Sequence, residues 1–145
     1  MRYLDRFVEA HELGDPAPYS HALREIRQGR KESHWMWYIF PQLRDLGRSS
    51  RAYIYGIVDL AEAKEYLQDP YLGGHLREIT AVLLQLEEND PVKIFGGIDA
   101  QKLCSSMTLF SLAEGEDSVY GRVLAKYYRG QKDPKTLRLL GVEEA

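Results

Sequence analysis

Four Asp–Pro pairs divide the chain and constrain its fold more than any other feature. They are Asp15–Pro16, Asp69–Pro70, Asp90–Pro91 and Asp133–Pro134. An aspartate directly before a helix accepts a hydrogen bond from a free N–H group of the first turn, and a proline at the first helical position sacrifices no hydrogen bond. Each pair therefore predicts the start of a helix.

Apolar residues recur at spacings of three and four after several of these starts, as they do along one face of an amphipathic helix. The longest stripe consists of Leu76, Ile79, Val82, Leu83 and Leu86. Signals for strands are scarce, because no Asn-Gly or Asp-Gly pair joins two alternating runs. The pattern predicts an all-α fold of about eight helices, with more than half of the residues helical and no sheet larger than a hairpin.

The chain of 145 residues contains no linker or repeat that would divide it, so we expect one globular domain over residues 1–145. The first residues lack the apolar run of a signal peptide, and the longest apolar stretch, residues 35–41, is far shorter than the ~20 residues that span a bilayer. The single cysteine, Cys104, excludes an internal disulfide. We therefore expect a cytoplasmic protein without a membrane partner.

Residues 35–41 form an unbroken aromatic and apolar run that leaves no face for water. A helix that is apolar all round is buried, and Pro41 disfavours helical geometry at the residue before it. A buried strand is the alternative, but no neighbouring segment would pair with it. We predict a short buried helix, with Trp35 and Trp37 largely buried against the helix that contains residues 103–110.

Polar residues lie within this run and on either side of it at helical spacing. His34, Tyr38 and Gln42 recur every fourth residue, and Lys31 lies one turn before His34. Polar groups beside an aromatic wall are typical of a small-molecule pocket. Buried backbone carbonyls would satisfy the same groups equally well, so ordinary core packing remains the alternative.

Charge is distributed unevenly along the chain. The whole sequence has a net charge of -3, which argues against a nucleic-acid partner, yet residues 24–51 contain seven basic and three acidic side chains. Within that segment Arg48, Ser49 and Arg51 stand at the start of a predicted short helix, where free N–H groups and guanidinium groups suit a phosphate or carboxylate. A solvated basic surface with an ordinary N-cap serine is the alternative.

A second polar cluster lies on the helix predicted for residues 99–112. Its members are Asp99, Lys102, Ser105, Ser106 and Thr108. Serine and threonine are mediocre inside helices because they compete for backbone hydrogen bonds. Their presence on a helix that packs inward is typical either of close helix–helix packing or of a pocket wall.

No metal or cofactor is predicted from the sequence. Its histidines are not spaced as metal ligands, and no phosphate-binding loop, dinucleotide fingerprint or nucleophile elbow occurs. A lone cysteine such as Cys104 is usually a small core residue, and we do not assign it as a nucleophile.

Residues 29–43, GRKESHWMWYIFPQL, are similar to the signature of a bacterial family called domain of unknown function 1810, whose members are sometimes mislabelled calpastatin. The resemblance continues through residues 94–96, 102–103 and 105–110, and covers the chain from Leu4 to about Leu140. It implies a compact, mainly helical single domain and brings no established reaction. Calpastatin acts through disordered segments, which this globular composition does not match.

The chain departs from that family at three positions. Glycine is common in the family where this chain has Asp45, and arginine is common where it has His75 and Cys104. The resemblance therefore gives no support to a catalytic role for His75 or Cys104.

Our leading hypothesis is a protein that binds a small anionic ligand, nucleotide-like or phosphate-like, in an aromatic and basic pocket. We assign His34 as the acid–base group of any reaction, because the imidazole pKa lies near neutrality. The remaining assigned positions would contact the ligand: Lys31, Trp35, Trp37, Gln42, Arg48, Ser49, Arg51, Asp99, Lys102, Ser105 and Ser106.

This hypothesis predicts that the two polar clusters converge on one cavity, because buried donors and acceptors satisfy one another best when they face each other. The positions expected to converge are Lys31, His34, Gln42, Ser49, Asp99, Lys102 and Ser106. Two alternatives are a non-catalytic protein-interaction module with an exposed aromatic patch, and a hydrolase of nucleotide-like or ADP-ribosyl compounds. The sequence leaves the ligand, any reaction and the oligomeric state open.

Overall fold

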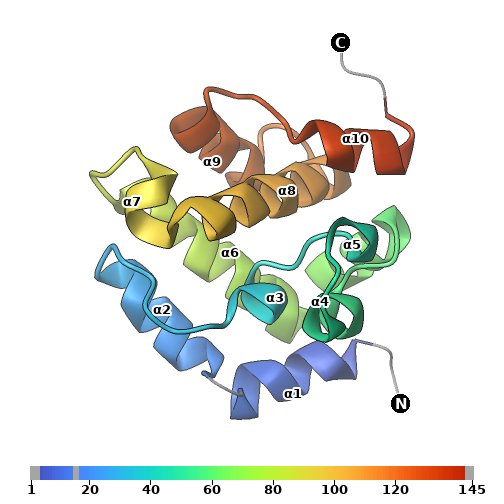
Figure 1. The fold of residues 1–145 in the computed structure, drawn as a ribbon, viewed down its shortest axis with the longest axis horizontal. Coiled ribbons are helices and arrows are strands. Elements are labelled where there is room, and N and C mark those ends of the chain that lie inside the picture. The colour runs from blue at the N-terminus through green and yellow to red at the C-terminus, as the bar shows by residue number, and fades with distance from the viewer. Residues whose placement is uncertain (1–3, 15–16, 143–145) are drawn as a thin grey trace.

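The computed structural model describes residues 4–14 and 17–142. Within these ranges the chain forms ten α-helices and one short 3-10 helix, and about 70% of the described residues are helical (Figure 1). The same residues form no strand, and their one isolated bridge joins Leu43 to Ile57. The predicted all-α fold is therefore confirmed. The expected number of about eight helices was too low, because helices of one turn are too short to show an apolar stripe.

The helices follow one another with short connections. In chain order they are α1 (Asp5–Leu13), α2 (Tyr19–Arg27), α3 (Met36–Ile39), the 3-10 helix η1 (Arg44–Leu46), α4 (Ser50–Tyr55), α5 (Leu60–Gln68), α6 (Pro70–Gln85), α7 (Pro91–Phe95), α8 (Gly97–Glu114), α9 (Val119–Tyr128) and α10 (Pro134–Leu140). None of the helices in the described ranges combines the length and the apolar character that a bilayer crossing requires.

Three of the four Asp–Pro pairs begin helices as predicted. Asp69 accepts hydrogen bonds from backbone N–H groups at the start of α6, Asp90 at the start of α7 and Asp133 at the start of α10. Asp15–Pro16 lies outside the described residues. These helix starts depend on contacts between neighbouring residues, which is why the sequence alone revealed them.

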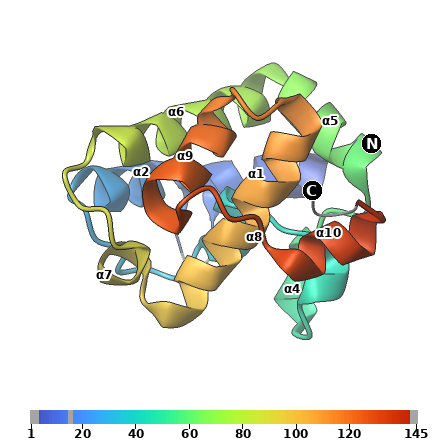
Figure 2. The same cartoon turned by 90° about the horizontal axis from the view of Figure 1, so that it is seen from above.

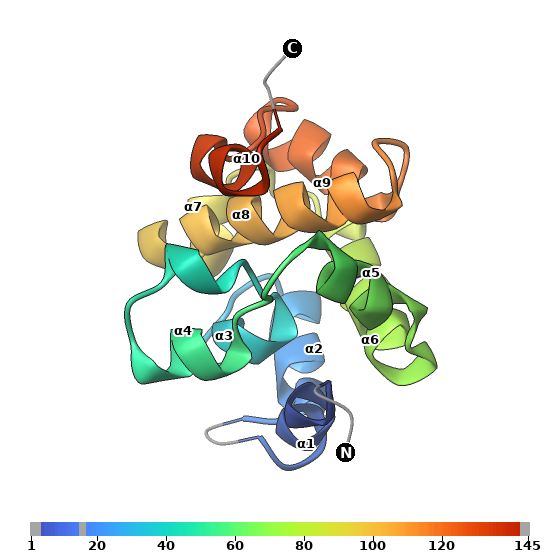
Figure 3. The ribbon, with the colours of Figure 1, turned by 90° about the vertical axis from the view of Figure 1, so that its right-hand side faces the viewer.

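Helix α8 is the centre of the fold. It lies between α9 and α10 on one side and α3, α4 and α5 on the other (Figures 1 and 3), while α6 runs along the edge of the molecule beside α9 (Figure 2). Residues 103–111 of α8 are buried without interruption. A helical segment surrounded on all sides needs apolar or small side chains at every position, and residues 103–111 have them.

The serine and threonine side chains of α8 fit this crowded position. The hydroxyls of Ser105, Thr108 and Ser111 each donate to a backbone carbonyl oxygen three or four residues earlier in the same helix. Small side chains that bond their own backbone can be buried without a partner from another helix. Close helix packing therefore accounts for much of the second polar cluster.

The aromatic run forms α3 and enters the core as predicted. Trp35, Tyr38 and Phe40 are at most 1% exposed, and the helix ends at Ile39, two residues before Pro41. Trp37 differs from the prediction, because its side chain is only partly buried. The exposed part of Trp37 faces the hollows described in the next subsection.

A buried carboxylate fixes the turn that precedes α3. Glu25 of α2 accepts hydrogen bonds from the backbone N–H groups of Glu32 and Ser33, from the Ser33 hydroxyl and from the indole N–H of Trp35. Burial alone would raise the pKa of Glu25, but these hydrogen bonds outweigh burial and lower the pKa to about 2. The carboxylate is therefore charged and ties the aromatic segment to α2.

Two histidines that are far apart in the sequence form a hydrogen-bonded pair that joins α1 to α6. Nδ1 of His11 lies 2.9 Å from Nδ1 of His75, and Nε2 of His11 lies 2.7 Å from the carbonyl oxygen of Tyr38. Because a carbonyl oxygen only accepts, His11 carries its hydrogen on Nε2, and its Nδ1 accepts from Nδ1–H of His75. Burial lowers the pKa of His11 to about 4, so the ring is neutral near pH 7.

We predict that Glu25→Gln destabilises the protein by about 2–4 kcal/mol, because the amide loses the charge and places an NH2 group where an acceptor is needed. Urea denaturation measures the loss. Glu32→Gln is the matched control, since Glu32 is exposed and its side chain has no hydrogen-bond partner among the described residues. Equal midpoints for the two variants would contradict the role of Glu25.

We predict that stability falls as the pH decreases from about 6.5 to about 4, because the unfolded chain binds a proton at His11 that the folded chain does not bind until about pH 4. Between pH 7.5 and pH 5 this one group should account for about 2 kcal/mol of unfolding free energy. His11→Gln keeps an N–H donor for the Tyr38 carbonyl and removes the titration. An unchanged pH dependence in this variant would show that His11 is not responsible.

Candidate functional site

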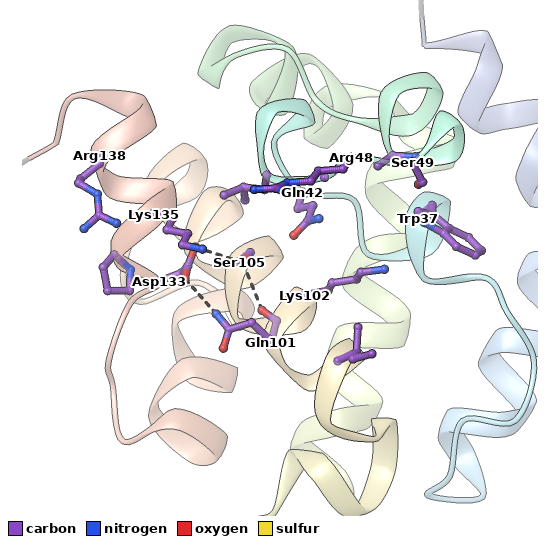
Figure 4. Close-up of a pocket in the computed structure, with 15 residues that line it drawn as sticks. Trp37, Gln42, Arg48, Ser49, Gln101, Lys102, Ser105, Asp133, Lys135 and Arg138 are labelled. Carbon is purple, nitrogen blue, oxygen red and sulfur yellow. Dashed lines mark hydrogen bonds between the residues drawn. The ribbon is translucent and has the colours of Figure 1, made fainter.

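Two adjoining hollows lie where α3, α4, α8 and α10 approach one another. The larger, here called the basic hollow, has a volume of about 840 Å³. Figure 4 shows α8, α10 and the segment around α4 contributing side chains to it from three sides. Its lining includes Trp37 and the following polar and charged residues: Gln42, Arg48, Ser49, Gln101, Lys102, Ser105, Asp133, Lys135 and Arg138.

The smaller hollow, here called the Asp99 hollow, has a volume of about 390 Å³ and lies at the start of α8. Its lining includes Lys31, His34 and Asp99 together with Gly96 and Gly97. Trp37, Ile98 and Lys102 line both hollows. The two hollows are therefore neighbours that share one wall.

Positive charge dominates the basic hollow. Four cationic side chains line it, and the single carboxylate among its lining residues is that of Asp133. Asp133 already accepts hydrogen bonds from Gln101, Ser105 and Thr136. Within the described ranges, Arg48, Lys135 and Arg138 form no ion pair, so their charges are available to a ligand.

Two cations lie close to the ring of Trp37 on the shared wall. The guanidinium carbon of Arg51 lies 5.1 Å from the centroid of its ring, and Nζ of Lys102 lies 5.2 Å from it. Cations at this distance interact favourably with the electron-rich face of an indole. The ring therefore holds two positive side chains beside the hollows.

Asp99 and Lys31 form the polar centre of the smaller hollow. Nζ of Lys31 lies 2.9 Å from one carboxylate oxygen of Asp99, and Nζ of Lys102 lies 3.9 Å from the other. Lys31 also donates to the carbonyl oxygen of Ser33 at 2.6 Å and lies 5.0 Å from the Trp35 ring centroid. The side chain of Lys31 is thus occupied by protein groups.

Most of the residues predicted for the site line one or both hollows. The basic hollow is lined by six of them: Trp37, Gln42, Arg48, Ser49, Lys102 and Ser105. The Asp99 hollow is lined by Lys31, His34 and Asp99, and also by Trp37 and Lys102. Arg51 lies against the Trp37 ring. The two polar clusters therefore meet, but their residues line two adjoining hollows and not the one cavity that was predicted, and Lys102 lines both.

Trp35 and Ser106 line neither hollow, contrary to their assignment as ligand contacts. Both are fully buried, and Trp35 donates its indole N–H to Glu25. The Ser106 hydroxyl has no hydrogen-bond partner among the described residues. Helical spacing placed them near the site, but the direction in which each side chain packs puts them in the core.

No pattern in the sequence indicates the contribution of α10 to the site. Lys135 and Arg138 lie one turn apart on this helix and line the basic hollow together with Gln101 of α8. The Asp133–Pro134 pair predicted the start of α10 without indicating what its basic face would meet. Only the packing of α10 against α8 and η1 brings these cations to the hollow.

Two other chemistries find no support in the described part of the chain. No three His, Cys, Asp or Glu side chains there are grouped as metal ligands. Burial raises the pKa of Cys104 to about 11, which keeps its thiol protonated at neutral pH. Cys104 therefore behaves as a core residue.

Comparison with known proteins identifies the family. Residues 1–140 match the family described as "Protein of unknown function (DUF1810)". None of the curated proteins matches the chain. The chain is similar to the conserved hypothetical protein Rv1873 from Mycobacterium tuberculosis, whose crystal structure superposes with a TM-score of 0.90 at 46% sequence identity over 97% of each chain. The match over residues 1–140 places this chain in the DUF1810 family.

Proposed function

We propose that the basic hollow binds a small anionic ligand of the phosphate or nucleotide class. One observation carries the proposal: cations from three separate segments face a single hollow whose one carboxylate is already hydrogen-bonded within the protein. Holding like charges together costs free energy, and a bound anion would offset that cost.

Each segment would contribute a different contact to the anion. Arg48 and Arg138 offer planar guanidinium groups that can bind a phosphate through two parallel hydrogen bonds, while Lys102 and Lys135 act as point charges. Gln42 supplies an amide that can donate or accept. This combination of guanidinium and ammonium groups suits an anion with several oxygens.

Trp37 is the aromatic residue of the motif that can touch a ligand. Trp35, Tyr38 and Phe40 are buried, so stacking by Trp35 is excluded. The cations beside the Trp37 ring restrict access to its face, and the ring then serves as an apolar wall. The same burial leaves the motif without an extended aromatic patch for binding another protein.

The proposal concerns binding, with His34 as the candidate acid–base group if a reaction takes place. His34 is exposed and lines the Asp99 hollow, next to the wall that both hollows share. A group in this position would act on the part of a ligand that extends beyond the basic hollow.

We expect inorganic pyrophosphate to raise the melting temperature at low ionic strength, by roughly 5–10 °C at about 100 times its dissociation constant. The double variant Lys135→Gln/Arg138→Gln should abolish this increase, because it removes the two cations that α10 supplies. Thermal-shift measurements over a concentration series provide the test.

The control is the double variant Lys64→Gln/Arg122→Gln, which changes the net charge equally at exposed positions that line neither hollow. It should respond to pyrophosphate as the unmodified protein does. A similar loss in both double variants would show that the response reflects overall charge, and the absence of any response in the unmodified protein would refute the proposed function.

We further predict that Lys102→Met weakens the pyrophosphate response and leaves the ligand-free fold intact. Lys102 lines both hollows, and its ion pair with Asp99 is long at 3.9 Å, so its loss should cost less than about 1 kcal/mol of unfolding free energy. Urea denaturation without ligand checks the second part. A variant that merely unfolds would identify Lys102 as a structural residue.

A further inference from the structure

The shared wall between the two hollows exposes apolar surface. Ile98 is 79% exposed although it is a large aliphatic residue, and it stands beside Trp37 on this wall. Lys102, the third shared residue, is partly buried. The route from one hollow to the other therefore passes over an isoleucine and an indole, which suit the carbon framework of a ligand.

The Asp99 hollow offers a hydrogen-bond acceptor that protein groups leave unused. One carboxylate oxygen of Asp99 binds the ammonium group of Lys31 at 2.9 Å. The other oxygen lies 3.9 Å from Nζ of Lys102, which is beyond hydrogen-bond distance. No described residue donates a hydrogen bond to that second oxygen, so it can accept one from a ligand.

The charges around Asp99 favour a neutral donor over a charged one. A ligand ammonium group would approach the ammonium groups of Lys31 and Lys102, and a second ligand anion would approach the unused oxygen of Asp99. A hydroxyl group meets neither repulsion and can donate to the carboxylate. His34 lines the same hollow and adds a side chain that can donate or accept.

We propose that the ligand is a hydroxylated phosphate ester that occupies both hollows. Its phosphate binds in the basic hollow, its carbon framework crosses Trp37 and Ile98, and its hydroxyl groups face Asp99 and His34. The proposal rests on the proposed function, because it adds a second contact region to the same anion site.

The experiment compares three probes by isothermal titration calorimetry on the full chain: inorganic phosphate, ribose and ribose 5-phosphate. We expect ribose 5-phosphate to bind at least about tenfold more tightly than phosphate, since a hydrogen bond to a charged group gives a gain of that size. Ribose alone should bind much more weakly, because it lacks the anionic group.

Gly97→Leu blocks the second contact region without altering the first. A Cβ atom at Gly97 would meet no atom within 4 Å, and Gly97 lines only the Asp99 hollow of the two. The leucine should therefore fill the hollow and leave the helix intact. Gly74→Leu is the matched control, because Gly74 is also helical with free space around its Cβ position and lines neither hollow.

We expect the dissociation constants of Gly97→Leu for ribose 5-phosphate and for phosphate to agree within about threefold, while Gly74→Leu keeps the roughly tenfold difference. Asp99→Asn, with circular dichroism to check the fold, should also reduce the difference. Equal binding of both phosphates by the unmodified protein, or a preference that Gly97→Leu leaves unchanged, would overturn the two-hollow ligand and leave the anion site standing. Failure of both phosphates to bind would refute the proposed function itself.

Discussion

The charged carboxylate of Glu25 is the interaction on which the site depends. It accepts hydrogen bonds from Glu32, Ser33 and Trp35, and so closes the turn between α2 and α3 around one buried group. That turn places Trp37 on the wall between the hollows and His34 at the rim of the smaller one. A buried carboxylate with several donors strongly favours one local geometry, because each donor that moves away leaves the charge less compensated.

Helix α8 carries the other half of the site, and a few polar contacts join it to the turn. Lys31 reaches Asp99 at the start of α8, and its backbone N–H donates to the carbonyl oxygen of Ile94 at the end of α7. Asp133 in turn links the start of α10 to Gln101 and Ser105 of α8. The polar groups that hold the walls of both hollows, such as Lys31 and Asp133, are thus largely occupied by other protein groups. Arg48, Lys135 and Arg138 remain available to bind a ligand. This separation between structural and available polar groups is the physical basis of the proposed anion site.

Several side chains that the sequence indicated as possible pocket residues have structural roles. Ser105 bonds to the Gln101 carbonyl oxygen and to Asp133, and Thr108 bonds to the Cys104 carbonyl oxygen and to the backbone of Asp133. His75, for which the sequence suggested no role, also has a structural one. It pairs with His11 and stacks on Tyr19 at a centroid distance of 3.7 Å. In both cases the role of the side chain depends on which other groups pack around it. The position of a single residue in the sequence carries little information about these neighbours.

The sequence by itself determined the helical fold, the three helix starts marked by Asp69, Asp90 and Asp133, and the burial of most of the aromatic run. Capping and apolar periodicity reveal these features because they depend on residues within four positions of one another. It also brought Lys31, His34, Asp99 and Lys102 into one prediction, since their polar character stood out beside apolar neighbours. Only the tertiary structure decided that Trp35 faces Glu25 while Trp37 faces the hollows, and that Lys135 and Arg138 of α10 complete the basic wall. The physical reason is that charge excess and cavity shape depend on contacts between segments more than 80 residues apart, such as Arg48 and Lys135, which no local pattern encodes.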